Sequence, residues 1–109
     1  MKLKKIISLI PALFMFFGIA WADTIKIGFN VPLTGFAAAD GESALNGAKL
    51  AVNQANASGG INGKQIELVV YDDQASPKEA VPIANRWIEK DGVKVAVSGS
   101  YSGSTRAAA

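Results

Sequence analysis

Apolar and polar residues alternate along the chain from residue 23 to residue 31. The apolar members would share one face of an extended backbone: Ile25, Ile27, Phe29 and Val31. A period of two residues is typical of a β-strand. This segment is therefore the first predicted strand, and a loop at residues 32–40 follows it.

The period changes to three and four residues from about Gly41 onward, at Leu45, Ala48, Val52 and Ala55. That spacing predicts a helix with one apolar face. The helix is expected to end at residues 58–60, Ser-Gly-Gly, because glycine adopts the left-handed conformation that follows many helices. Asn62-Gly63 then indicates a tight turn. Residues 65–71 form the second predicted strand, in which consecutive valines indicate that both faces are covered.

A second helix is predicted from Pro77 to about Lys90. Ser76 stands at its N-cap, and Glu79 three residues later completes a capping box. Its expected apolar face consists of Ala80, Ala84, Trp87 and Ile88. Pro82 removes one hydrogen bond from this helix. Gly92 ends it, and residues 93–97 form the third predicted strand.

Alternating strands and helices predict an α/β fold with a doubly wound parallel sheet and right-handed crossovers. A strand order of 2-1-3 would place the first two helices on opposite faces of the sheet. In such sheets, ligands bind beyond the carboxyl ends of the strands, where the chain reverses direction. The two loops at that reversal are residues 32–40 and 99–105.

Residues 1–22 have the three parts of a secretory signal peptide: a basic start, an apolar run at residues 6–19 and small residues before a cleavage site after Ala22. A membrane anchor is the alternative, but a spanning helix needs ~20 apolar residues, and this shorter run contains Pro11. We therefore expect export to the periplasm, with residues 23–109 as the mature part.

The charge balance changes once the leader is set aside. The whole chain has 11 basic and 9 acidic residues, and three of the basic residues, Lys2, Lys4 and Lys5, lie in the leader. The mature part is thus close to neutral, and no basic patch indicates a nucleic-acid partner. The chain contains no cysteine, which excludes a disulfide framework within it.

Few residues suited to catalysis or metal binding are present. The chain has no histidine and no cysteine, which are the commonest catalytic base and thiol nucleophile. Neither a dinucleotide fingerprint nor the lysine of a P-loop is found, so no nucleotide cofactor is expected. Asp72-Asp73 could be imagined as a metal pair, but adjacent residues at a strand end point in opposite directions. We favour a role for both acids in stabilising the loop before the second helix.

The loop at residues 99–105, Gly-Ser-Tyr-Ser-Gly-Ser-Thr, is the candidate site for an anion. Free N–H groups at a helix N-terminus stabilise a carboxylate or phosphate. Ser102 is interpreted as the N-cap of a helix that starts at Gly103, and its hydroxyl could face an anion as well. Tyr101 either stacks on a ligand or packs beneath the loop, with equal support for both. Asp40 is interpreted as a cap of the first helix in preference to a carboxylate for an ammonium group.

Taken in order behind a signal peptide, several motifs resemble the periplasmic branched-chain amino acid-binding proteins of ABC transporters, which have the type 1 periplasmic binding fold. They are residues 25–31, Leu33-Thr34-Gly35, Asn46-Gly47-Ala48, residues 53–63, Tyr71-Asp72-Asp73 with Pro77, and residues 99–105. The resemblance covers only the first part of the N-terminal lobe of that family. We therefore expect residues 23–109 to be the N-terminal part of a longer, leucine-binding-protein-like domain.

The resemblance implies a two-lobed binder that performs no chemistry, needs no cofactor and delivers a small ligand to an ABC permease in the inner membrane. Ser102 matches the serine that gives its hydroxyl and N–H to the ligand carboxylate. The full set of expected ligand-binding residues is Asp40, Tyr101, Ser102, Gly103, Ser104 and Thr105. Asp40 replaces an aromatic residue of leucine-binding members, which favours a more polar ligand. Ala75 and Tyr101 stand where the family has a small disulfide.

The expected function is thus capture of an amino acid, of the branched-chain type or more polar, or of a similar small carboxylate, for import. Two alternatives stay open. One is a ligand-sensing receptor domain of the same fold, which would be followed by a transmembrane helix. The other is an exported α/β enzyme whose catalytic residues lie outside this sequence.

Overall fold

A computed structural model describes residues 24–99 and 101–109. The elements follow in the order β1 (Ile25–Val31), α1 (Ala38–Ala57), β2 (Ile66–Asp72), α2 (Pro77–Arg86), the π-helical turn η3 (Trp87–Asp91), β3 (Val95–Ser98) and α3 (Ser102–Ala108). The expected signal peptide and its cleavage site lie outside the described residues. Among those residues, no helix combines the length and the apolar character needed to cross a bilayer.

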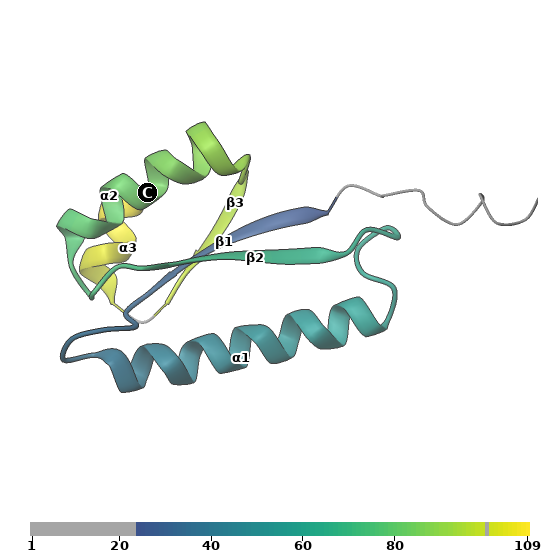
Figure 1. Ribbon diagram of the computed structural model, residues 1–109, viewed down its shortest axis with the longest axis horizontal. Helices are drawn as coiled ribbons and strands as arrows, with labels where there is room; N and C mark the ends of the chain where they lie inside the picture. The colour runs from purple at the N-terminus through teal and green to yellow at the C-terminus, as the bar shows by residue number, and fades with distance from the viewer. Residues whose placement is uncertain (1–23, 100) are drawn as a thin grey trace, which may run out of the picture.

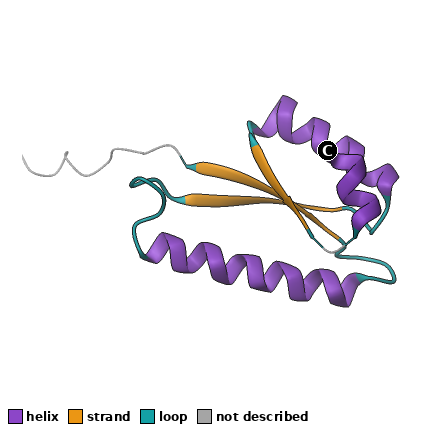
Figure 2. Ribbon diagram, turned by 180° about the vertical axis from the view of Figure 1, so that it is seen from behind, coloured by secondary structure: helices purple, strands orange, loops and turns teal. Residues whose placement is uncertain are grey.

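The strands form one parallel sheet in the order β2-β1-β3. In the central strand, Ile27 lies opposite Leu68 of β2 and opposite Val95 of β3. The helix α1 covers one face of the sheet, and α2 and α3 lie together on the other (Figure 1). The sheet is seen edge-on between these two layers in Figure 2. The predicted α/β class, the parallel sheet and the strand order 2-1-3 are therefore confirmed.

The apolar core between the sheet and the α2 layer is built around Trp87. Ile83, Trp87 and Val93 are buried together. The Trp87 indole lies against Gly28 in β1. A Cβ atom on Gly28 would come within 2.6 Å of the Trp87 ring, so only glycine fits there. The indole N–H also donates a hydrogen bond of 3.2 Å to the Val69 carbonyl oxygen. A buried indole whose one donor is satisfied contributes apolar area without an unpaired polar group.

The second predicted helix differs from the observed one in its last turn. The structure has α2 up to Arg86 and then the wider turn η3. Ile88 lies in that turn and is 72% exposed, so it does not share the buried face of Ala80 and Trp87. Its assignment to the apolar face is therefore wrong, because a π-helical turn shifts side chains away from the α-helical spacing. Gly92 ends the segment as predicted, and its φ of 70° lies in the left-handed region.

The start of α2 was predicted to contain a capping box, and this detail is also wrong. Ser76 does occupy the N-cap position, but its side chain forms no capping hydrogen bond. The Glu79 N–H donates instead to the backbone carbonyl of Ser76, at 3.1 Å. Pro77, the first helical residue, has no N–H group, so this helix end has one fewer donor that needs an acceptor.

At the opposite end of the sheet, Asn62-Gly63 forms the tight turn that the sequence indicates. Asn62 has φ of 51° and Gly63 has φ of 78°, the pair of positive angles that a type I′ turn needs. The flanking residues Ile61 and Lys64 exchange two backbone hydrogen bonds of 2.9 Å. The turn leads the chain from α1 into β2.

Candidate ligand-binding site

The loops that follow β1 and β3 lie side by side at the carboxyl edge of the sheet. The Tyr101 hydroxyl donates a hydrogen bond of 3.0 Å to Asp40 Oδ2. The rings of Tyr101 and Phe36 meet edge to face, with centroids 5.9 Å apart. The strand order predicted this meeting of residues 32–40 with residues 99–105, and the two contacts join them directly. Ser100 lies outside the described residues.

Asp40 lies inside the first turn of α1 and does not cap it. The helix begins at Ala38, Ala37 occupies the N-cap position, and no side chain forms a capping bond there. The capping interpretation of Asp40 is therefore wrong: a turn with a hydrogen bond of 3.3 Å from the Ala38 N–H to the Gly35 carbonyl leads the chain into the helix earlier than predicted. The Asp40 carboxylate remains at the positive end of the α1 dipole, where a negative charge is favoured.

Tyr101 contacts the loop after β1 through Phe36 and the first turn of α1 through Asp40. Its hydrogen bond to Asp40 raises the pKa of the Tyr101 phenol above the ordinary value of 10.0, and partial burial and the charge of Asp40 add to the effect. The physical reason is that a phenolate beside a carboxylate loses the hydrogen bond and gains a repulsion. At neutral pH the phenol is thus a donor that holds the Asp40 carboxylate in place.

Ser102 is the first residue of α3, not its N-cap. Tyr101 occupies the N-cap position with an extended backbone (φ −120°, ψ 119°), and no side-chain capping bond forms. The interpretation of Ser102 as N-cap is wrong because the helix starts one residue earlier than predicted. N–H groups in a first helical turn have no acceptor within the helix. The exposed Ser102 hydroxyl therefore stands beside free N–H groups, which is the chemistry that an anion needs.

The other predicted residues of α3 face its neighbours. Gly103 lies against α2, where an added Cβ would be 3.4 Å from the Pro77 ring. Ser104 is 1% exposed, and its hydroxyl has no hydrogen-bond partner among the described residues. The Thr105 hydroxyl lies 2.8 Å from Ser98 Oγ and 3.0 Å from the Tyr101 carbonyl oxygen. Ser104 and Thr105 thus contact the scaffold in this structure, whereas Ser102 is exposed at the junction of the loops.

Asp72 fastens the first loop to the end of β2. Its carboxylate accepts hydrogen bonds from the Leu33 N–H at 2.8 Å, the Thr34 hydroxyl at 2.5 Å and the Gln74 N–H at 2.9 Å. Burial alone would raise the pKa of Asp72, but these hydrogen bonds outweigh it and lower the pKa below the ordinary 3.8. The charged form of Asp72 is therefore the form that holds the loop.

Asp73 is fully buried and has a separate set of partners. Its carboxylate accepts hydrogen bonds from the Asn30 side-chain amide at 2.7 Å and from the Ala75 N–H at 2.9 Å. Both acids thus accept a hydrogen bond from the loop before α2, and each has further partners of its own, the first loop for Asp72 and Asn30 for Asp73. No cluster of three or more potential metal ligands occurs in the described part of the chain.

Two residues of this region were not identified from the sequence. The Phe36 ring is 84% exposed beside Tyr101, and a lone aromatic residue in a loop of glycine and alanine could have pointed to it. Asn30 is fully buried at the end of the central strand. A polar residue among the apolar ones just before a loop was the available sign, since buried amides need specific partners.

Comparison with known proteins identifies related sequences over nearly all of the described region. A family model for periplasmic binding proteins matches residues 24–109. A leucine-, isoleucine-, valine-, threonine- and alanine-binding protein from Pseudomonas aeruginosa is 47% identical over 80% of this chain and 23% of its own length.

Solved structures with the same fold are also similar in sequence. A branched-chain amino acid transporter substrate binding protein from Streptococcus pneumoniae, in complex with isoleucine, matches with a TM-score of 0.74 and 43% identity, over 79% of this chain and 25% of that one. A solute binding protein of an ABC transporter from Rhodopseudomonas palustris, in complex with 3,4-dihydroxybenzoic acid, matches with a TM-score of 0.72 and 33% identity, over 81% and 24%. The chain thus spans about a quarter of the length of the relatives it matches.

Proposed function

This chain belongs to the periplasmic binding protein family, and on that premise we propose that it is the N-terminal part of an ABC transporter substrate-binding protein. The proposed ligand is an amino acid, or a similar small compound with a carboxylate, which the protein binds without altering it. Residues 1–22 serve as a cleaved signal peptide and residues 23–109 begin the first lobe, so the protein acts in the periplasm and passes its ligand to an inner-membrane permease.

The observation that carries the proposal is the position of Ser102. Its hydroxyl is exposed at the first turn of α3, next to the Tyr101–Asp40 hydrogen bond that joins the two loops. A ligand carboxylate there would accept hydrogen bonds from the Ser102 hydroxyl and from N–H groups of the same turn. Each such bond to a charged group contributes about 1.5–3 kcal/mol.

The class of ligand follows from the neighbours of Ser102. The two similar structures were solved with isoleucine and with 3,4-dihydroxybenzoic acid, two compounds that share a carboxylate and differ in the rest of the molecule. In this chain the adjacent wall has the Asp40 carboxylate and the Phe36 ring. That pairing favours a ligand with an apolar part and a hydrogen-bond donor, and threonine satisfies both conditions better than leucine does.

Calorimetry on the full-length protein tests this function. We expect binding of at least one of leucine, isoleucine, valine, threonine and alanine, and none of the matching amines that lack the carboxylate. Ser102→Ala should weaken binding about tenfold or more, the equivalent of roughly 1.4 kcal/mol. Ser43→Ala, an exposed serine in the middle of α1, is the matched control and should leave the affinity unchanged.

Three results would contradict the proposal. Equal binding of an amino acid and of the matching amine, which lacks the carboxylate, would show that the protein does not recognise the carboxylate. Unchanged affinity in Ser102→Ala would remove Ser102 from the site. Chemical conversion of the bound compound, detected by mass spectrometry after incubation, would indicate an enzyme in place of a carrier.

A further inference from the structure

Asn30 has a position unlike that of any other polar side chain in the sheet. It lies near the end of the central strand β1, is fully buried, and faces the α2 and α3 layer together with Gly28. Buried amides are retained where their hydrogen bonds have a structural or functional use. The contacts of Asn30 indicate what that use is.

Asn30 is hydrogen-bonded to the loop that follows β3 and to the loop that follows β2. Its backbone carbonyl accepts a hydrogen bond of 2.8 Å from the Gly99 N–H, the first residue of the loop that leads to α3. Its side-chain amide donates the 2.7 Å bond to the buried Asp73 carboxylate. Asp73 in turn binds the Ala75 N–H through its side chain and the Ser76 N–H through its carbonyl, at 2.9 and 2.7 Å. One residue thus connects the start of the α3 loop with the loop that leads to α2.

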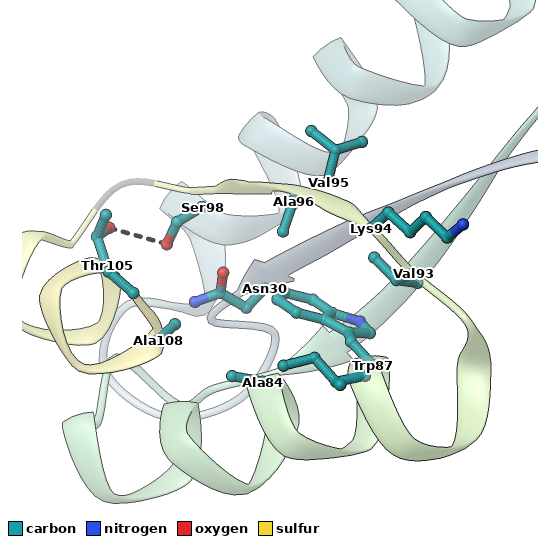
Figure 3. A pocket seen from close by; sticks show the side chains of 12 residues that line it. Asn30, Ala84, Trp87, Val93, Lys94, Val95, Ala96, Ser98, Thr105 and Ala108 are labelled. Carbon is teal, nitrogen blue, oxygen red and sulfur yellow. Dashed lines mark hydrogen bonds between the residues drawn. The ribbon is translucent and has the colours of Figure 1, made fainter.

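The same side chain lies near α3. Asn30 lines a cavity of about 300 Å³ together with Ser98, Thr105 and Ala108. Figure 3 shows Asn30 between the α3 residues on one side and Trp87 on the other. Its Oδ1 atom is buried and has no partner among the described residues. The Thr105 hydroxyl binds Ser98, which lies opposite Asn30 in the sheet register.

We propose that Asn30 is a positioning residue for the candidate ligand site, holding Gly99 and Asp73 so that the first turn of α3 presents Ser102 to the ligand. The inference rests on the proposed function and extends it to a residue that does not touch the ligand. The Asp73 carboxylate accepts two hydrogen bonds, and loss of the Asn30 amide would remove one of them while the carboxylate stays buried. A buried carboxylate with too few donors is unstable, so either water enters or the loop that holds Asp73 moves. The loop that moves is connected through Asn30 to Gly99.

Two substitutions in the full-length protein test the inference by calorimetry, with threonine and isoleucine as probes. Asn30→Leu removes the donor at similar volume, and we expect affinity to fall about tenfold. Asn30→Asp at pH 5 should bind within threefold of the unaltered protein, because two carboxyl groups at this distance share a proton and the protonated one can donate to Asp73 as the amide does. Asn53→Asp, an exposed position on α1, is the control for added charge and should bind like the unaltered protein at every pH.

The pH dependence separates positioning from simple packing. We expect the ratio of the Asn30→Asp dissociation constant to that of the unaltered protein to rise between pH 5 and pH 8.5, as the shared proton is lost. The titratable groups near Asn30 are Asp73, in contact with it, and Lys94, which lines the same cavity; the Asp72 carboxylate faces the first loop instead. Backbone amide signals of Gly99 and Ala75 should titrate with the same apparent pKa in this variant.

The inference is overturned if Asn30→Leu binds within threefold of the unaltered protein. If Asn30→Leu does not fold, Asn30→Asp alone tests the inference. A ratio of dissociation constants and amide signals of Gly99 and Ala75 that all stay constant with pH would then overturn the inference. An unaltered protein that binds none of leucine, isoleucine, valine, threonine and alanine refutes the proposed function. In that case the amide signals of Gly99 in Asn30→Asp still show whether Asn30 sets the position of the loop.

Discussion

The two ends of the sheet are joined to their loops in different ways. At the amino end, Asn62-Gly63 turns the chain through its backbone angles, and the neutral Asn56 side chain holds Ile66 through hydrogen bonds of 2.7 and 2.9 Å. At the carboxyl end, the carboxylates of Asp72 and Asp73 accept bonds from the loops. Carboxylates that accept hydrogen bonds from loop N–H groups thus lie at the end of the sheet that has the candidate ligand site.

The difference separates a purely structural end from one that can respond to a ligand. Neutral amide bonds and backbone turns depend little on pH or on a neighbouring charge. Carboxylates that hold loops depend on both, since their hydrogen bonds form with the charged group. The carboxyl end also has exposed groups, among them the Phe36 ring and the Ser102 hydroxyl. Stability and recognition therefore share residues at one end of the sheet only.

The largest expected effect comes from crowding the carboxyl end. A Cβ atom on Gly41, in the first turn of α1, would overlap the Pro32 carbonyl oxygen, whereas Gly47 in the same helix has open space around it. Gly41→Ala in the full-length protein should lower the free energy of unfolding by about 1–3 kcal/mol or more. Gly47→Ala is the control and should raise it by about 0.5–1 kcal/mol, because alanine favours the helix. Urea unfolding measures both, and a Gly41→Ala variant as stable as the unaltered protein would show that Gly41 and the Pro32 carbonyl are not in close contact in solution.

A smaller effect should separate the two ends by pH. The pKa of Asp72 in the folded protein lies below 3.8, so its contribution to stability is present above that value and is lost as the pH falls through the lowered pKa. Asp72→Asn should therefore destabilise the protein at pH 7 and have less effect near pH 3. Solvent screening keeps the contribution modest, since the group is partly exposed.

Asn56→Ala at the amino end is the comparison for that experiment. It removes two neutral hydrogen bonds and should cost about 1–3 kcal/mol of unfolding free energy, by the same amount at pH 3 and pH 7. Thermal unfolding at the two pH values measures both variants. An equal pH dependence of Asp72→Asn and Asn56→Ala would remove the distinction between the ends.

The smallest expected effect concerns the bond that joins the two loops. Asp40→Asn should lower the pKa of Tyr101 toward 10.0, because it removes the carboxylate that accepts the phenol hydrogen and repels the phenolate. Carbon-13 labelling of the tyrosine rings follows this titration by NMR. Glu42→Gln, two residues further along α1, should leave the pKa of Tyr101 as it is in the unaltered protein. A Tyr101 pKa that is the same in Asp40→Asn and in the unaltered protein would indicate that the loops are not joined in solution.

The order of the elements and the sheet topology could be predicted because they depend on periodicity and on the handedness of crossovers. The change from a period of two to a period of three and four marks each boundary within a few residues. The expected strand order 2-1-3 places residues 32–40 and 99–105 at one edge of the sheet. Both loops do meet there, through Tyr101 and Asp40.

The errors arose where the exact first residue of a helix decides a side chain's role. Ser102 and Asp40 were both assigned to caps, and both lie inside the first turn because their helices start earlier than the sequence indicates. Ile88 was placed on the buried face because periodicity cannot reveal a π-helical turn. The function of Asn30 could not be predicted either, since its partner Asp73 is distant in sequence and meets it only through the parallel pairing of β1 and β2.

The most direct test of the central claim is a crystal structure of the full-length protein grown with threonine or isoleucine. The account predicts the ligand carboxylate within hydrogen-bond distance of the Ser102 hydroxyl and of an N–H group in the first turn of α3, beside the Asp40–Tyr101 pair and the Phe36 ring. A ligand bound elsewhere, or one whose carboxylate points away from α3, would contradict it.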